Sequence, residues 1–494
     1  MPPNSEFVSF SGLQNCLSLA LFVFIRDPYS CVPLFSDSNA KSLPTLCRLL
    51  TADCTTEKDT VSEERPSYPW SDPSPNSLSM MSCHLLCFPF ALEVPDETMA
   101  KVLQMYRSCD IVSQLLQLAL ALPLCLLELP LSLLCHLLLS DPGHSVPCFT
   151  TAAEACGFFL PPAKMGQNDD RDQSQSGNAR GCDETGQPSK RTASSLLAAF
   201  LQSEALSSSA VELISLVSQT ARFLLLPPFS ILYVDPSLLR LALTHTDDRV
   251  RAATCSLLGN LNPLVPQSHC DPPLLPLFHD MIGQLHGPCL AVRRAACRAV
   301  GNWLGLVGQD SRDGSELTKE AGGSFTAEAK TKAGEKTASA RPSGEDSASL
   351  SKARVEQEVD RWAESVQGAA PVLLPLLRDP DPLIRRHCCA ALGNIAAING
   401  GGVMLLQCDA LNLLLQITCV DPQNAVRQAA LTSLCLFSQQ DILRQALVSL
   451  DAEEKLRHVS QNTSLACQCS RLMNKLWPTL NPQQGRVPHS AVTE

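Results

Sequence analysis

The chain has few aromatic and few charged residues for its length. Only 5% of its 494 residues are Phe, Trp or Tyr, and 18% are charged. Strands are typically rich in aromatic and β-branched residues, whereas Leu, Ala and Ser run throughout this sequence, so the composition favours helices. Basic residues are also scarce, with 38 Lys and Arg against 49 Asp and Glu and a net charge of −11. Because nucleic-acid binding depends on clustered positive charge, no nucleic-acid partner is expected.

Motifs of the common enzyme classes are missing as well. A protein kinase needs a Gly-rich phosphate loop, a strand lysine, an H-R-D catalytic loop and a D-F-G metal ligand, and none of these occurs. The G-x-S-x-G turn of many hydrolases is also absent, and the 10 histidines define no constellation. We therefore expect no catalytic residue and no cofactor in this chain.

Spacings typical of metal sites are absent too. No C-x-x-C pair of the kind found in structural zinc sites occurs. His387, Cys388 and Cys389 are consecutive, so on a helix they point in different directions and cannot all bind one ion. Most of the 23 cysteines lie inside apolar runs, as expected of reduced thiols in an intracellular protein. We predict no metal site and a cytoplasmic location.

Long uninterrupted apolar runs are also lacking. Residues 16–25 are apolar but too few to cross a bilayer, and no basic flank or cleavage site marks a signal peptide. Residues 118–139 are numerous enough, but Glu128, His136 and two prolines fall within that stretch, where charge is costly in a membrane. We expect no membrane span.

Polar segments divide the chain into helical blocks. Residues 51–79, 164–192 and 308–356 are poor in large apolar side chains, so burial cannot offset the entropy lost on ordering them. We predict a helical segment over residues 1–50, a linker over 51–79, helical repeats over 80–163, a disordered linker over 164–192, repeats over 193–307, a disordered insertion over 308–356, repeats with a C-terminal cap over 357–476, and a disordered tail over 477–494.

Internal self-similarity is the strongest signal in the sequence. Four segments share one pattern, and they read DDRVRAATCSLLGNL, CLAVRRAACRAVGNW, DPLIRRHCCAALGNI and PQNAVRQAALTSLCLF. Aligned on Val250, Val292, Ile384 and Val426, the first and last intervals are both 42 residues, a period typical of armadillo and HEAT units. The middle interval is longer by 50 residues, which the polar run over 308–356 almost accounts for. The sequence predicts an all-α armadillo/HEAT-like solenoid with disordered insertions.

Apolar residues mark one face of each repeated helix. In the third copy they are Ile384, Cys388, Leu392 and Ile395, spaced so that they line one side of a helix. An apolar run before each copy supplies a partner helix, and a turn such as Asp379-Pro380 joins the two. Each unit is then a helical hairpin whose open face is covered by the next unit.

Two polar positions recur beside this apolar face. An arginine follows the alignment position in every copy, as Arg251, Arg293, Arg385 and Arg427. These arginines either form a basic ladder for an acidic partner or, as is more ordinary, pair with an Asp or a carbonyl of the adjacent repeat. An asparagine recurs nine residues after the arginine in three copies, as Asn260, Asn302 and Asn394. All seven are candidate partner-binding residues.

The asparagines have two interpretations. In armadillo peptide receptors such a residue binds an extended peptide backbone, with a Trp four residues earlier. Here that earlier position holds Ser256, Arg298 and Ala390, so a receptor of nuclear localisation signals is not expected. The alternative is that the asparagines hydrogen-bond turns within the stack. The fourth copy has Cys435 and Leu436 instead of Gly-Asn, as expected of a terminal capping unit.

Several unrepeated strings are more specific than the period. They are SCHLLCFPFAL at 82–92, ELPLSLL at 128–134, LLQCDA at 405–410 and QALVSLDAEEKL at 445–456. Together with the repeats they resemble the C-terminal region of the vertebrate Fused-type serine/threonine kinase. That resemblance implies a non-catalytic regulatory scaffold whose partners are proteins of Hedgehog signalling or of the cilium, and a place near the cilium. The alternative is a fragment of an active kinase whose catalytic domain is missing from this chain.

Overall fold

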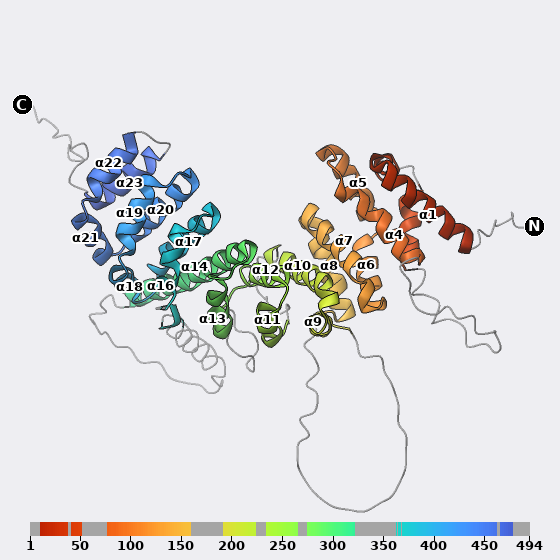
Figure 1. The fold of residues 1–494 in the computed structure, drawn as a ribbon, viewed down its shortest axis with the longest axis horizontal. Coiled ribbons are helices and arrows are strands. Elements are labelled where there is room, and N and C mark those ends of the chain that lie inside the picture. The colour runs from red at the N-terminus through yellow and green to blue at the C-terminus, as the bar shows by residue number, and fades with distance from the viewer. Residues whose placement is uncertain are drawn as a thin grey trace, which may run out of the picture. The chain divides into compact units, whose positions relative to one another are not determined.

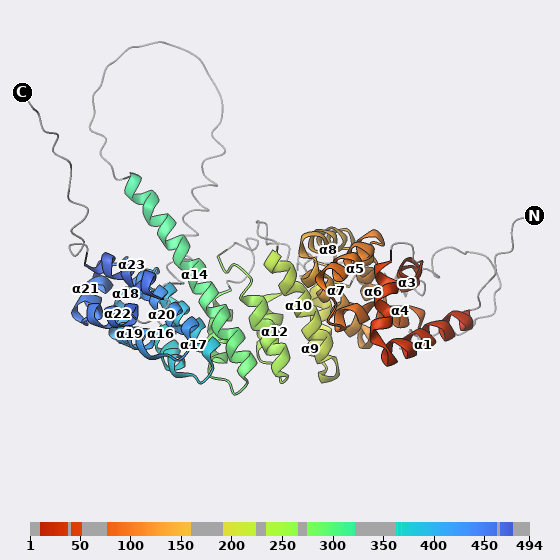
Figure 2. The same ribbon diagram turned by 90° about the horizontal axis from the view of Figure 1, so that it is seen from above.

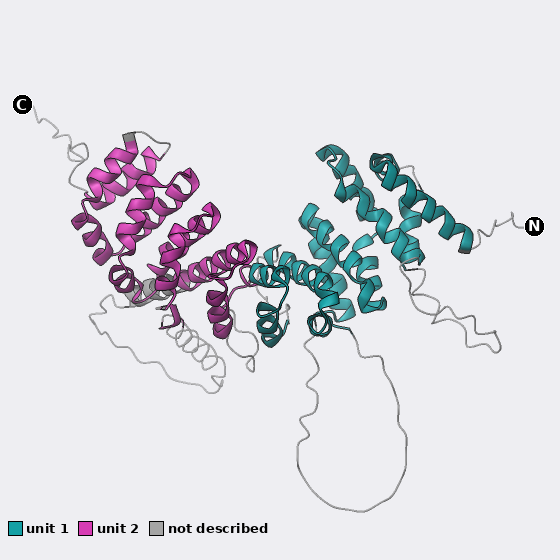
Figure 3. Ribbon diagram, in the orientation of Figure 1, with its two compact units in different colours: residues 1–257 teal, residues 258–494 magenta. Residues whose placement is uncertain are grey.

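The computed structural model describes residues 10–37, 41–51, 77–159, 191–223, 234–264, 274–321, 362, 364–366, 368–461 and 465–477. Over these ranges the backbone forms helices and turns and no strand. The predicted all-α fold is therefore confirmed. The chain divides into two compact units, residues 1–257 and residues 258–494 (Figure 3).

The first unit is built from short helices (Figure 1). They are α1 (Phe10–Arg26), α2 (Cys31–Ser36), α3 (Ser42–Leu50), α4 (Leu78–Cys87), α5 (Asp96–Ser108), α6 (Ile111–Ala121), α7 (Glu128–Ser140), α8 (Pro142–Cys156), α9 (Ala193–Leu201), α10 (Ser207–Phe223), α11 (Pro236–Leu243) and α12 (Asp248–Leu258), whose last residue belongs to the second unit. Short 3-10 turns connect some of them: η1 (Pro28–Ser30), η2 (Phe88–Ala91), η3 (Leu124–Leu126) and η4 (Glu204–Leu206).

Tyr106 marks the core of the N-terminal part of this unit. Its side chain is 1% exposed, and its hydroxyl donates to the Leu86 carbonyl at 2.8 Å. Burial raises the pKa of Tyr106 well above its usual range, and neighbouring thiols, among them Cys47 and Cys87, add to the rise. The cysteines of the described residues are free thiols, many of them buried, so they serve as small apolar core residues.

The second unit contains the later copies of the repeat. Its helices are α13 (Leu275–Gln284), α14 (Leu290–Ala321), α16 (Ala369–Leu373), η6 (Leu374–Arg378), α17 (Pro382–Ile395), α18 (Gly401–Gln407), α19 (Ala410–Val420), α20 (Asn424–Phe437), α21 (Asp441–Ser449), α22 (Ala452–Gln461) and α23 (Ala466–Leu476). The last three aligned segments form α14, α17 and α20, and α17 lies between the other two and packs against both (Figure 2). The repeat alignment therefore identified a row of neighbouring helices.

The predicted apolar face of the third copy is buried. Ile384, Cys388, Leu392 and Ile395 are all 0% exposed. α17 packs through this side against η6 and α16, which form the preceding helical segment of the same repeat. The hairpin predicted for each unit is present here, with Asp379 and Pro380 in the turn.

Aspartate followed by proline begins several helices. Asp381 precedes Pro382 at the start of α17, and its carboxylate accepts the Ile384 backbone N–H at 3.1 Å. Asp235 caps α11 in the same way, ahead of Pro236. The carboxylate satisfies an N–H that lacks a partner in the first turn, and proline fits that turn because it needs no donor.

The predicted linkers mostly lie outside the described residues. That applies to nearly all of 51–79 and 164–192, to most of 308–356 and to the tail after Trp477. The structure differs at two boundaries. α4 begins at Leu78, inside the predicted 51–79 linker, and α14 continues past Gly308, where the insertion was predicted to begin. Gly308 is buried, and a Cβ added there would lie 2.8 Å from the Ala397 Cβ, so this residue belongs to the packed repeat.

Apolar helices of the described residues are short or bent. Residues 118–139, weighed above as a membrane span, are divided between α6, η3 and α7. No single helix is long and apolar enough to cross a membrane over the described ranges. One pair, α18 with α19, meets the length and composition test together but bends by 73° at the break.

Candidate functional site

Two predicted asparagines form the same hydrogen bond in successive repeats. Nδ2 of Asn302 donates to the Gly259 carbonyl at 2.8 Å, and Nδ2 of Asn394 donates to the Gly301 carbonyl at 2.9 Å. Each acceptor is the glycine that precedes the asparagine position in the preceding copy. The amide nitrogens therefore join neighbouring repeats.

Asn260 occupies the same position in the first copy. It is half-buried and also interacts with another residue. The structure thus gives all three asparagines a role within the chain, close to the second of the two interpretations above. Binding of a partner by these residues stays a prediction.

Small residues bring α14, α17 and α20 into close contact, and we call the two contacts, α14 with α17 and α17 with α20, the seam. A Cβ added at Gly305 of α14 would lie 2.9 Å from Nδ2 of Asn394. On the other side of α17, Gly393 lies against Ser433, whose hydroxyl donates to the Cys389 carbonyl at 2.7 Å. The seam has no room for larger side chains, so the helices are held in a fixed register.

The recurrent arginines bind the turn that precedes their own helix. Nη1 of Arg385 donates to the carbonyls of Asp379 and Pro380 at 2.8 and 3.1 Å. Arg251 and Arg293 bind the equivalent carbonyls, those of His245 and Thr246 at 2.5 and 3.2 Å and those of Gly287 and Pro288 at 3.0 and 2.9 Å. These carbonyls lie in the turn that ends the preceding segment of the same hairpin. Each guanidinium therefore holds that turn against the start of its own helix.

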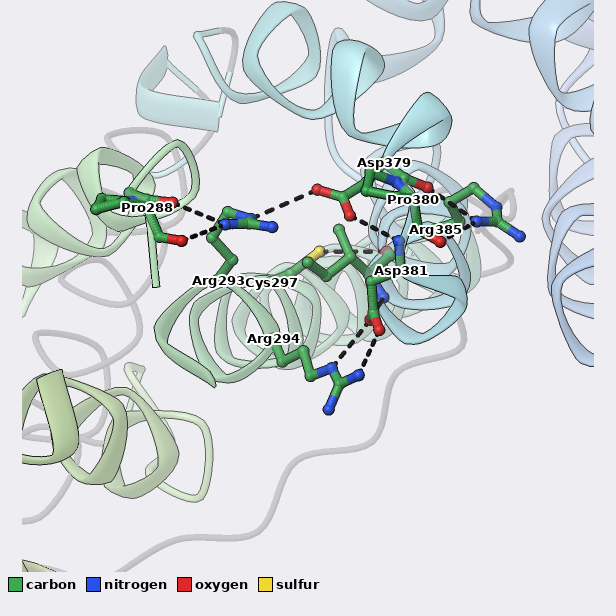
Figure 4. Close-up of polar contacts among 10 residues, drawn as sticks. Pro288, Arg293, Arg294, Cys297, Asp379, Pro380, Asp381 and Arg385 are labelled. Carbon is green, nitrogen blue, oxygen red and sulfur yellow. Dashed lines mark hydrogen bonds and ion pairs between the residues drawn. The ribbon is translucent and has the colours of Figure 1, made fainter. Parts of the chain in front are cut away.

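Two of these arginines also reach the next repeat. Arg385 binds Asp421 through Nε at 2.7 Å and Nη2 at 3.1 Å, and the two side chains are only 10% and 6% exposed. Donating these hydrogen bonds to the Asp421 carboxylate raises the pKa of Arg385 further above its usual range. Arg293 lies 3.4 Å from Asp379 in the same way (Figure 4). Arg293 and Arg385 are therefore engaged inside the stack.

Arg427, in the last copy, has different surroundings. It pairs with Asn424 on its own helix, and its Nε is buried without a hydrogen-bond partner among the described residues. Arg293 and Arg385 each form an ion pair with the next repeat, and among the described residues Arg427 forms no such pair. A terminal unit lacks a following repeat of the same kind, which fits the predicted cap.

A second group of arginines was missed by the sequence analysis. Arg294, Arg298 and Arg386 lie one or five residues after the recurrent arginine position. Arg294 binds Asp381 of the next repeat, with Nε to Oδ1 at 3.0 Å, and this bond lowers the pKa of that carboxyl (Figure 4). The two consecutive arginines in the second and third copies are the sequence feature that could have identified Arg294 and Arg386.

The sequence cluster at His387, Cys388 and Cys389 shows no sign of a metal site. Both thiols are buried, and Cys388 donates to the Leu373 carbonyl at 2.9 Å. Burial raises the pKa of the Cys388 thiol well above its usual range, so it is neither a good ligand nor a nucleophile. Over the described residues no group of three His, Cys, Asp or Glu side chains is arranged to hold a metal ion.

A depression of about 360 Å³ lies beside Arg385. Its apolar part comes from η6 and α19, including Leu377, Leu413 and Ile417, and its acidic groups are Asp379 and Asp421. Both carboxylates are already paired with arginines of the stack. The depression therefore offers no free acid or base for general acid–base chemistry.

Comparison with known proteins finds one family model and several solved structures that are similar to parts of this chain. The model of the armadillo/beta-catenin-like repeat matches residues 365–397, which contain α16, η6 and α17. Among solved structures, a designed armadillo repeat protein is similar with a TM-score of 0.38 and 16% identity, over 58% of this chain and 98% of that chain.

Curated relatives match along almost the whole chain. Serine/threonine-protein kinase 36 of Pongo abelii is 28% identical and that of Mus musculus 26% identical, each over 97% of this chain. The chain spans 31% of the length of either relative, in their non-catalytic C-terminal part. The resemblance stated from the sequence is confirmed, and the region compared is a helical-repeat region without kinase motifs.

Proposed function

We propose that this chain is a protein-binding scaffold, the regulatory helical-repeat part of a Fused-type serine/threonine kinase that acts in Hedgehog signalling and cilium assembly. Its partners are then proteins of that pathway or of the cilium, met in the cytoplasm or at the cilium. The similarity to serine/threonine-protein kinase 36 over 97% of the chain supports the kinase relationship. Armadillo repeats bind proteins, which supports the scaffold role.

The observation that carries the scaffold role is the seam. Asn394 and the Arg385–Asp421 pair tie α17 to the repeats before and after it. Interlocked repeats give a rigid row of helices whose solvent-facing side chains keep fixed spacings, and such surfaces are what repeat proteins use for binding. At α17, Arg385 is paired with Asp421, and the Cys388 thiol is buried with a raised pKa.

Proximity labelling in ciliated cells tests this proposal. The chain fused to a biotin ligase should label ciliary or Hedgehog-pathway proteins. The Leu392→Asp variant, in which the buried face of α17 is disrupted, should no longer label these proteins. Leu383→Asp is the matched control, because Leu383 lies on the same helix and is 42% exposed. Unchanged labelling with Leu392→Asp, or labelling of no such proteins by the parent, would contradict the scaffold role.

A second candidate is that the chain is a piece of an active kinase. The observation that favours it is the 31% share of the relatives' length that the chain spans. Reading the genomic sequence upstream of the codon for Met1 distinguishes the two. An in-frame kinase domain there supports the fragment, whereas a promoter and a true first exon support a stand-alone scaffold.

A further inference from the structure

The first helix, α1, is apolar on both of its sides but packs on only one. Residues 19–25 read LALFVFI, and α1 contains no Asp or Glu. On the inner side Leu17 and Phe24 are buried. The Phe24 ring lies edge-on to the rings of Phe35 and Phe88, with centroids 6.1 and 5.3 Å apart. This side joins α1 to α2, η2 and α4 within the first unit (Figure 1).

The outer side of α1 exposes large apolar side chains. They are Leu19, Phe22, Val23 and Ile25, and they are 63%, 57%, 41% and 69% exposed. At 3.6 residues per turn these four fall on the half of the helix opposite the buried pair. A helix at a protein surface normally carries polar side chains on its solvent side. We call these four residues the end face.

Exposed apolar side chains are concentrated in this part of the structure. Of the 14 large ones that are exposed among the described residues, six fall within residues 19–34, the other two being Tyr29 and Leu34. Single exposed apolar residues are ordinary, whereas a patch of a few hundred Å² marks an interaction site. The clustering therefore indicates that another surface covers the end face.

The last described helix, α23, shows how a capping helix differs from α1. Its exposed residues are mostly polar, and they are Cys467, Ser470, Arg471, Asn474 and Lys475. A terminal repeat of a solenoid stays soluble because its outer face is polar. The outer side of α1 has no such face, so it has the surface of a stacking helix and not of a cap.

We propose that the end face binds the end face of a second copy of this chain, with the two α1 helices antiparallel across a two-fold axis near Phe22. A second copy supplies an apolar helix of the same length, 17 residues or about 25 Å. Charge does not oppose the contact. The one charged residue of α1 is Arg26, whose guanidinium carbon lies 5.4 Å from the centroid of the Phe22 ring. In an antiparallel pair the two arginines lie on opposite sides of the crossing point.

Other occupants fit the end face less well. Helices that lie on anionic membranes carry several Lys or Arg residues beside their apolar face, whereas α1 has only Arg26, in a chain of net charge −11. Residues 1–9 are too few to form the helical hairpin that covers a repeat in this chain. A second copy is therefore the occupant that the charge and the extent of the end face favour.

The size and symmetry of the contact predict how the chain associates. A few hundred Å² per copy is less than the 800 Å² or so per partner of a stable complex, so we expect a Kd of about 1–50 μM. Both copies use the same surface, so association stops at two copies. The dimer presents each partner-binding surface twice, and a partner with two sites is then held by avidity.

Sedimentation velocity with the full chain tests the proposal. Between about 0.5 and 100 μM the chain should shift from monomer to dimer and form no larger species. Phe22→Glu should weaken dimerisation at least tenfold, because it places two carboxylates next to each other at the two-fold axis. Leu241→Glu is the matched control. Leu241 lies in α11, outside the end face, and is 50% exposed, so this change should leave dimerisation unaltered.

Variants of opposite charge separate loss of binding from loss of folding. Phe22→Lys alone should also weaken dimerisation, but an equimolar mixture of Phe22→Lys and Phe22→Glu should associate more tightly than either variant alone. Misfolded chains would not recover in this way. Ile25→Glu, at the most exposed residue of the end face, replaces Phe22→Glu if circular dichroism shows that the latter does not fold.

Several results would overturn the proposal. They are a chain that remains monomeric at about 100 μM, association that continues beyond the dimer, and dimerisation that the folded Phe22→Glu and Ile25→Glu variants leave unchanged. A mixture of the Glu and Lys variants that fails to associate would refute the two-fold arrangement. Cosedimentation of a non-dimerising chain with phosphatidylserine vesicles, abolished by Phe22→Glu, would assign the end face to a membrane instead.

Discussion

Gly393 is a position in α17 where a side chain has no room. A Cβ added there would lie 2.5 Å from Oγ and 3.2 Å from Cα of Ser433, so the backbone of α20 would have to move. We expect Gly393→Ala to destabilise the chain by about 1–3 kcal/mol, as overpacking of a tight contact does. Gly283→Ala in α13 is the control, because no atom lies within 4 Å of the added Cβ. That change should leave stability equal or raise it by up to about 1 kcal/mol, and urea unfolding compares the two.

Leu392 tests whether the face of α17 is buried as described. Its side chain is 0% exposed, so Leu392→Asp would place a carboxylate without a counter-charge in an apolar contact. We expect a loss of about 3 kcal/mol or more and a clearly lower melting temperature. Leu383→Asp makes the same chemical change on the same helix at a residue that is 42% exposed, and it should cost well under half as much. Equal melting temperatures for Leu392→Asp and the parent would mean that the repeat alignment is wrong.

His387 makes the stability of the second unit depend on pH. Burial, with Arg386 and Arg298, lowers its folded pKa below the ordinary value of about 6.5. Below pH 6.5 the unfolded chain therefore takes up this proton more readily than the folded chain. Stability contributed by the neutral imidazole is present above that pH and is lost as pH falls toward the folded pKa. His387→Gln should lose less stability than the parent between pH 7 and pH 5.

Measurement at two pH values isolates this effect. Urea unfolding at pH 8, where the imidazole is neutral in both states, gives the difference between variant and parent that comes from packing alone. The same difference at pH 5 should shift in favour of the variant. An unchanged difference would show that His387 titrates alike in the folded and unfolded chain.

At the scale of elements, the Arg385–Asp421 pair joins α17 to the turn before α20. Arg385→Ala leaves Asp421 buried without its partner, and we expect a loss of about 3–5 kcal/mol. A double-mutant cycle with Asp421→Ala should give a coupling energy of about 1–3 kcal/mol, measured by urea unfolding. The comparison cycle is Arg294 with Asp381, where the arginine is 42% exposed and solvent screens the charges, so the coupling should stay below about 1 kcal/mol. Equal couplings would contradict the importance assigned to burial.

The helices of the repeat were predictable from local pattern alone. The 42-residue period located α12, α14, α17 and α20, and the apolar spacing identified Leu392 as buried, because helical periodicity is a property of neighbouring residues. The boundary at Gly308 was not predictable in this way. Its glycine and the polar residues after it are typical of a loop, and its place in the core comes from contact with Asn394, Ala397 and Ile398 of another repeat.

The partners of the recurrent polar residues were harder to predict. The period shows that Asn394 and Asn302 occupy equivalent places, but it does not show that the amide reaches the Gly301 carbonyl of the preceding repeat. The same holds for Arg386, since exposure depends on which side of the helix its neighbours cover. Register between helices is set by small residues such as Gly393, and this information is absent from a hydrophobic pattern.

For the whole molecule, the absence of kinase motifs predicts the absence of phosphotransfer. The purified chain with radiolabelled ATP and a general acceptor protein should transfer no phosphate, because no loop to hold the phosphates and no D-F-G metal ligand occur in the sequence. A small unrelated kinase assayed in parallel shows that the conditions support transfer. Transfer that a point mutation in this chain abolishes would refute the non-catalytic assignment.

The hydrogen bond from Asn394 to Gly301 also bears on how such a chain can change over generations. Its two residues lie on α14 and α17, so the bond is indifferent to the length of the sequence between those helices. Descendants are therefore free to lengthen, shorten or rewrite the segment between residues 321 and 362, and to acquire new regulatory motifs in it. The bond uses the backbone carbonyl of residue 301, which any amino acid supplies, so it constrains the asparagine at 394 and the register of the two helices more than the glycine.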